Sequence, residues 1–101
     1  MTREDEIYQL LHDVFCDAHD RLAGHRVVLF GSRARGDARP RSDFDVGVIG
    51  ETPLQLEDFY ALEDQIESLP TLYRIDWVDL ARAGEKLRQS VLANMEVIYE
   101  A

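Results

Sequence analysis

The chain has 101 residues, of which 46% are hydrophobic, and a net charge of −9 from 20 acidic and 11 basic residues. A chain of this length buries roughly 60–70% of its unfolded surface, enough for one core, so we expect a single domain over residues 1–101. The acidic balance argues against nucleic acid as the main ligand, because such surfaces neutralise phosphates with Lys and Arg. Without a bilayer-length apolar run or a signal-peptide pattern, the chain is expected to be cytoplasmic, with no membrane segment.

The spacing of apolar residues predicts an α+β domain with the element order α-β-β-α-β-α-β. The predicted elements are a helix over residues 3–22, strands over 26–30 and 43–48, a helix over 53–69, a strand over 72–78, a helix over 83–95 and a strand over 97–99. The second long helix is expected to begin with a capping box, formed by Thr52 and Gln55, with Pro53 in the first helical position.

Two of the predicted strands indicate how the sheet is covered. Residues 27–30 are apolar without interruption, which is typical of a central strand buried on both faces. Residues 43–48 alternate instead, with Phe44, Val46 and Val48 on one face and acidic residues on the other. That alternation predicts a sheet covered by helices on one face only.

Gly31 and Ser32 follow the first predicted strand and form the first candidate binding feature. Glycine lets the backbone approach a ligand closely, and free N–H groups at the start of a helical turn attract phosphate. Four of the 11 basic residues lie in the loop that follows and favour a small anionic ligand: Arg33, Arg35, Arg39 and Arg41. The alternatives are a turn without a ligand, and arginines that are solvated or paired with acidic residues.

Asp43 and Asp45 form the second feature, because a strand places both carboxylates on one face. Like charges about 4 Å apart repel by roughly 4 kcal/mol at an effective dielectric of about 20, and Mg²⁺ relieves that repulsion. Asp76 lies on the polar face of the third predicted strand and is a candidate third acid. Asp79 has the opposite parity and is expected to cap the next helix. The alternative for Asp43 and Asp45 is a solvated strand face.

These features resemble the signature of the DNA polymerase β-like nucleotidyltransferase superfamily, in which Gly-Ser is followed after ten residues by Asp-x-Asp. The run from Phe30 to Gly36, the segment 75–80 and Ile98-Tyr99 are similar, more closely, to the minimal nucleotidyltransferase (MNT) family. The likeness extends over most of the chain from Val28 to Tyr99. It implies the polymerase β-like palm fold, a small mixed sheet with helices packed on one face.

The resemblance also implies a site and a reaction. Nucleotide phosphates would be bound by Gly31 and Ser32, with contacts from Arg33 and Arg35, and Mg²⁺ by Asp43 and Asp45, with Asp76 as third acid. Two Mg²⁺ ions would align a hydroxyl on the α-phosphorus of ATP and neutralise the leaving pyrophosphate. Some antitoxin-type members of the family transfer AMP to a tyrosine of a helical HEPN-domain toxin, so a HEPN partner is expected.

Two other functions stay open at this point. A non-catalytic antitoxin would neutralise its partner by forming a complex, with a vestigial or regulatory nucleotide site. A small-molecule nucleotidyltransferase would modify a compound such as an antibiotic, although relatives of that kind carry an added substrate-binding domain. The presence of all three acids favours catalysis, since a blocking protein has no need to keep them together.

Overall fold

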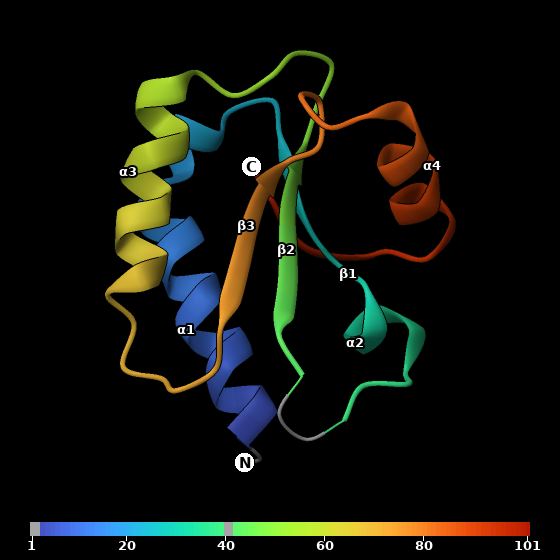
Figure 1. Cartoon of the computed structure of the whole chain (residues 1–101). Helices are drawn as coiled ribbons and strands as arrows, with labels where there is room; N and C mark the ends of the chain where they lie inside the picture. Colours follow the sequence, from blue (N-terminus) through green and yellow to red (C-terminus); the bar gives the residue numbers. More distant parts are fainter. Residues whose placement is uncertain (1–2, 40–41) are drawn as a thin grey trace.

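Four strands form one mixed sheet in the computed structural model, which describes residues 3–39 and 42–101 (Figure 1). The strands are β1 (Arg26–Phe30), β2 (Phe44–Ile49), β3 (Ile75–Asp79) and β4 (Glu96–Glu100). β1 pairs antiparallel with β2 and β4, while β2 pairs parallel with β3, giving the order β3-β2-β1-β4. The helices are α1 (Arg3–Asp17), the 3₁₀ helix η1 (His19–Leu22), the one-turn α2 (Ser32–Arg35), α3 (Leu56–Glu67) and α4 (Glu85–Ala93). The predicted α+β class and element order are confirmed, but the helix predicted over residues 3–22 is divided into α1 and η1, and α2 is an addition.

The central strand β1 is buried on both faces, as its apolar run predicts. Each of its four apolar side chains is at most 7% exposed. Val27 and Leu29 face the larger core, which includes buried side chains of α1 and α3. Val28 and Phe30 face the other way and cluster with Leu80 and Val91. Burial of one such side chain contributes about 1.5–3 kcal/mol, so both faces of β1 stabilise the fold.

The helices do not all pack on one face, and this corrects the expectation from the alternating strand. Figure 1 shows α1 and α3 on one side of the sheet and α4, with the short α2, on the other. The reason is the second apolar face of β1, since Val28 and Phe30 need a cover and Val91 of α4 supplies it. None of the helices in the described part of the chain has the length and hydrophobicity needed to cross a bilayer.

The segment between β2 and α3 differs from the prediction for a physical reason. The expected capping box is wrong: α3 begins at Leu56, and Gln55 at its N-cap makes no side-chain capping bond. Leu54 is instead buried, and its N–H donates to Oδ2 of Asp79 at 2.9 Å. Asp79 also accepts a hydrogen bond from the N–H of Ala81 at 3.0 Å, so its carboxylate links two loops. It does not cap α4 as predicted, because α4 begins after Gly84.

Candidate functional site

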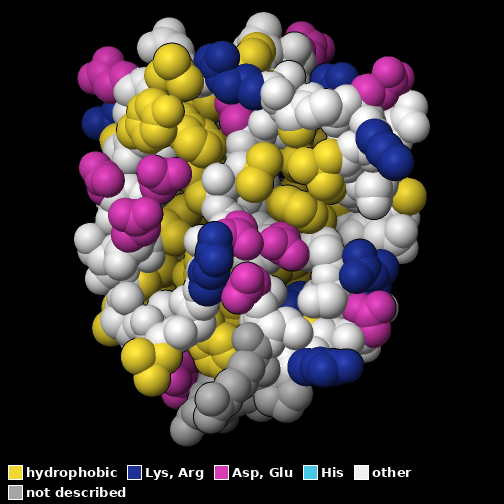
Figure 2. All heavy atoms as spheres, in the orientation of Figure 1, with side chains coloured by type: hydrophobic (Ala, Val, Ile, Leu, Met, Phe, Trp, Pro, Cys, Tyr) yellow, Lys and Arg dark blue, Asp and Glu magenta, His cyan; other side chains and the backbone are white. Residues whose placement is uncertain are grey.

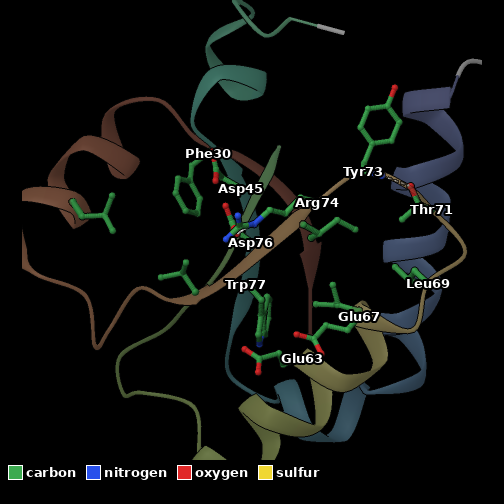
Figure 3. A pocket seen from close by; sticks show the side chains of 14 residues that line it. Phe30, Asp45, Glu63, Glu67, Leu69, Thr71, Tyr73, Arg74, Asp76 and Trp77 are labelled. Atoms are coloured by element: carbon green, nitrogen blue, oxygen red, sulfur yellow. Dashed lines mark hydrogen bonds and ion pairs between the residues drawn. The ribbon is translucent and has the colours of Figure 1, made fainter. Parts of the chain in front are cut away.

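Two carboxylates lie side by side on neighbouring strands. In the sheet register Asp45 of β2 is opposite Phe30 of β1 on one side and opposite Asp76 of β3 on the other. Residues directly opposite in paired strands point to the same face, so the three side chains form a row across the sheet. Figure 3 shows Asp45 and Asp76 next to each other, with Phe30 beside them. Asp43 lies one residue before the start of β2, with an exposed side chain.

The electrostatics of Asp45 reflect this crowding of acids. Burial is the main cause that raises the pKa of its carboxyl group, and the negative charges of Asp76 and Asp43 and a hydrogen bond with Asp76 raise it further. Arg35 acts in the opposite direction. A carboxyl group in this position is ionised only at a cost, which a nearby cation would reduce. The register of β2 and β3 thus brings Asp76 beside Asp45, as the parity of the two strands predicts.

Gly31 brings the turn between β1 and α2 directly against this carboxylate. Its backbone angles, φ 75° and ψ −154°, belong to a region that only glycine adopts without strain. A Cβ atom at this position would collide with Oδ2 of Asp45 and lie 3.1 Å from its Cγ. Because Gly31 has no side chain, the chain passes next to Asp45 and starts α2 with Ser32.

A first hollow of about 360 Å³ opens beside this turn. Gly31, Ser32, Arg35 and Asp45 line one side of it. The other side is formed by Leu87, Ser90 and Val91 of α4 and by Asn94, which directly follows this helix. These α4 residues were not predicted from the sequence, because no motif marks them and only the packing of α4 on the second face brings them here.

A second, larger hollow of about 670 Å³ lies on the other side of Asp45. Figure 3 shows this region, in which Arg74 reaches across Asp76; its Nε donates to Oδ1 of Asp76 at 3.0 Å. Phe30, Asp45 and Leu87 line both hollows, so the two meet at the Asp45 carboxylate. Figure 2 shows acidic side chains gathered in the middle of this face of the molecule.

Arg33, which was predicted to contact the nucleotide, lines neither hollow. Its side chain is only 2% exposed, and Nε and one terminal nitrogen donate to the main-chain oxygen of Ser42 at 3.2 and 2.7 Å. The other terminal nitrogen pairs with Glu4 at 2.8 Å, and the guanidinium lies 3.9 Å from the ring centroid of Phe44. Arg33 therefore attaches the loop to the core, whereas Arg35 is about half exposed and lines the first hollow. Arg41 falls outside the described residues.

The carboxylates of this site fit a metal ion that is shared with a substrate, and do not fit a metal ion held by protein side chains alone. Among residues 3–39 and 42–101, no group of three or more His, Cys, Asp or Glu side chains is arranged to hold a metal by itself. Mg²⁺ is commonly held by one or two carboxylates, while water and substrate phosphates complete its shell. The adjacent Asp45 and Asp76 carboxylates, next to a hollow lined by Ser32 and Arg35, fit such a shared site.

Comparisons with known proteins identify the family of this chain. The sequence model of the family "Polymerase beta, Nucleotidyltransferase" matches residues 20–101. A protein adenylyltransferase MntA of Thermococcus cleftensis is 31% identical over 99 residues, which cover 98% of this chain and 97% of the relative. A probable protein adenylyltransferase MntA of Haemophilus influenzae is 32% identical over 76 residues, covering 75% and 67%.

Solved structures show the same fold at lower sequence identity. A toxin–antitoxin crystal structure with AMP-PNP superposes with a TM-score of 0.65 at 23% identity, covering 89% of this chain and 73% of the other. A complex of a tri-AMPylated Shewanella oneidensis HEPN toxin with its MNT antitoxin gives 0.61 at 22% identity, covering 93% and 73%. Together with the family match and the two relatives, these findings establish that the chain belongs to the polymerase β-type nucleotidyltransferase family.

Proposed function

We propose that this nucleotidyltransferase is the antitoxin of a toxin–antitoxin pair and transfers AMP from ATP, with Mg²⁺, to a hydroxyl group of a HEPN-type partner. The observation that carries the proposal is the contact of the Gly31 turn with Asp45, whose carboxylate faces Asp76. Two relatives named protein adenylyltransferase support the reaction. The structural neighbours that contain AMP-PNP or an AMPylated HEPN toxin support the choice of nucleotide and partner.

The first hollow is the place we assign to the triphosphate. Gly31 allows the phosphates to approach the backbone, and the Ser32 hydroxyl donates a hydrogen bond to a phosphate oxygen. The Arg35 guanidinium adds a charge-assisted contact from the same side. Arg33 is left out of the nucleotide site, since its donors are engaged with Ser42 and Glu4.

The carboxylates of Asp43, Asp45 and Asp76 are the groups we assign to Mg²⁺, with two ions expected. When bound, the ions neutralise charge on the triphosphate and lower the pKa of the acceptor hydroxyl. Asp45 occupies the central position, because it borders both hollows and lies between Phe30 and Asp76. Asp76 lines only the second hollow, where an acceptor has room to approach.

The reaction is an in-line displacement at the α-phosphorus. The acceptor oxygen forms a new bond to this phosphorus while the bond from the phosphorus to the α,β-bridging oxygen breaks. The acceptor proton passes to the Asp76 carboxylate, and pyrophosphate leaves on the side of Ser32 and Arg35. Asp45 lines both hollows, so a nucleotide in the first hollow and an acceptor in the second would meet at this residue. This arrangement suits an in-line displacement.

The test is transfer of label from α-labelled ATP to a co-expressed HEPN partner in the presence of Mg²⁺. Wild type is compared with Asp43→Asn plus Asp45→Asn, and complex formation is followed by size-exclusion chromatography. Label on the partner with wild type only supports the proposal. No label with wild type, in a complex that still forms, would show that the protein acts as a non-catalytic binding module.

A further inference from the structure

The larger hollow runs along β3, the strand at one edge of the sheet. It is lined on one side by Asp45 and Asp76 and on the other by Glu63 and Glu67 of α3. Figure 3 shows Glu63 and Glu67 on the α3 side of β3, with the indole of Trp77 close to Glu63, and the two aspartates on its opposite side. The hollow therefore passes over the free edge of β3 and joins the two faces of the sheet.

The main chain of β3 has hydrogen-bonding groups directed into this hollow. The bonds that flank its ladder with β2 use the carbonyl of Arg74, which accepts from Phe44, and the N–H of Leu80, which donates to Val48. Alternate residues of a strand direct their main-chain groups to opposite sides, so Ile75 and Trp77 direct theirs away from β2. An exposed edge of this kind is a template for pairing with a further extended segment.

Glu63 and Glu67 have no role inside the described part of the chain. Neither side chain makes a hydrogen bond or an ion pair with another described residue, and neither belongs to the carboxylate group around Asp45. They are four residues apart on one helix, an arrangement in which like charges destabilise the helix. Among the described residues that line the hollow, Arg74 is the one basic residue, and it is paired with Asp76. The α3 side of the hollow is therefore an acidic surface without a counter-charge.

From these features we infer that the hollow binds an extended segment of the acceptor protein along β3, with basic side chains directly beside the modified residue. The inference rests on the proposed function and names the acceptor sequence that it selects. Successive side chains of a strand point to opposite faces, so a hydroxyl residue directed at Asp76 places both adjacent residues on the Glu63 and Glu67 side. Those two neighbours are roughly 7 Å apart, close to the roughly 6 Å between side chains four residues apart on a helix.

The experiment uses short fluorescein-labelled peptides with a central tyrosine in an otherwise Gln and Thr sequence. One peptide has Arg immediately before and after the tyrosine, a second has both Arg residues one position further out, and a third has none. Binding to the full chain with Mg²⁺ and AMP-PNP is measured by fluorescence anisotropy. The variants are Glu63→Gln plus Glu67→Gln and, as a control of equal charge on the same helix, Glu57→Gln plus Asp64→Asn, whose residues do not line the hollow.

The expected result is that wild type binds the peptide with adjacent Arg residues about fivefold more tightly than either other peptide, since two partly exposed ion pairs contribute modestly. The preference disappears in Glu63→Gln plus Glu67→Gln, persists in the control variant and weakens with added salt. Equal binding of the peptides with adjacent and outer Arg, or no binding of any peptide, would overturn the inference. Binding of a fluorescent ATP analogue to the same samples reports on the proposed function separately, because the two glutamates lie outside the nucleotide hollow.

Discussion

Replacement of Gly31 by alanine combines two separate effects at one position. The backbone angles, φ 75° and ψ −154°, cost a residue with a Cβ atom about 1–3 kcal/mol. The new methyl group would also collide with Oδ2 of Asp45 and approach its Cγ to 3.1 Å. For a domain of this size, each kcal/mol lowers Tm by roughly 4–8 °C, so we expect Gly31→Ala to melt at a distinctly lower temperature than wild type.

The chain offers controls that separate backbone strain from displacement of Asp45. Gly24 and Gly36 also have positive φ angles, +79° and +82°, but a Cβ atom at either position has no other atom within 4 Å. Gly24→Ala and Gly36→Ala therefore introduce strain without contact with the carboxylate. Their loss of stability is expected to be within the same 1–3 kcal/mol range, and their active sites are expected to stay intact.

The assay is calorimetric titration of each variant with AMP-PNP and Mg²⁺, at a temperature well below all the melting transitions. Gly31→Ala is expected to bind at least tenfold more weakly than wild type, equivalent to about 1.4 kcal/mol, because Asp45 moves from its position beside the first hollow. Gly24→Ala and Gly36→Ala are expected to bind as wild type does. If Gly31→Ala binds as tightly as these controls, the argument that Gly31 and Asp45 form one site is refuted.

Three further substitutions have expected outcomes. Asp45→Asn relieves a cross-strand repulsion of about 0.5 kcal/mol, so at neutral pH without Mg²⁺ it is expected to raise Tm by roughly 2–4 °C. A carboxyl group with a raised folded-state pKa binds its proton more tightly in the folded state, so its contribution to stability falls as pH rises through that pKa. The higher Tm of Asp45→Asn should therefore vanish as pH is lowered through the same range. A Tm difference that does not change with pH would contradict the raised pKa of Asp45. Arg35→Ala is expected to weaken AMP-PNP binding about tenfold at unchanged Tm, since its ion pair with Asp37 is exposed; unchanged affinity would exclude Arg35 from the site. Arg33→Met is expected to cost about 2 kcal/mol of unfolding free energy in urea titrations, because the Ser42 carbonyl loses a charged donor. The nucleotide affinity of this variant is expected to equal that of wild type. A large loss of nucleotide affinity would show that Arg33 belongs to the nucleotide site.

The spacing of apolar and acidic residues along the chain was sufficient to predict the order of helices and strands and the shared face of Asp45 and Asp76. Parity along a strand predicted that Asp76, and not Asp79, faces the same side as Asp45, and the parallel register of β2 and β3 places them opposite each other. The same reasoning predicted that β1 is buried on both faces. This burial was inconsistent with helices on one face only, and the apolar side chains of Val28 and Phe30 explain why α4 lies on the second face.

Sequence reasoning did not find contacts between residues on different loops or elements. Asp79 was expected to cap the adjacent helix, but it accepts a hydrogen bond from Leu54, which lies on a different loop. Arg33 and Arg35 are alike in sequence, and only the folded loop separates them: Phe44 and Ser42 surround the first, while the second remains beside the hollow. No local pattern distinguishes Glu63 and Glu67 from ordinary solvated helix residues, because their position depends on the packing of α3 beside β3.

The central claim, transfer of a nucleotidyl group with Asp45 and Asp76 at its centre, is tested most directly by parallel reactions with α-labelled and γ-labelled ATP. Wild type, Asp45→Asn and Asp76→Asn are each incubated with Mg²⁺ and the co-expressed HEPN partner, and label on the partner is counted. We predict label from α-labelled ATP only, with wild type only, and release of the γ label in pyrophosphate. Label on the partner from γ-labelled ATP, or undiminished α label with both variants, would contradict the account.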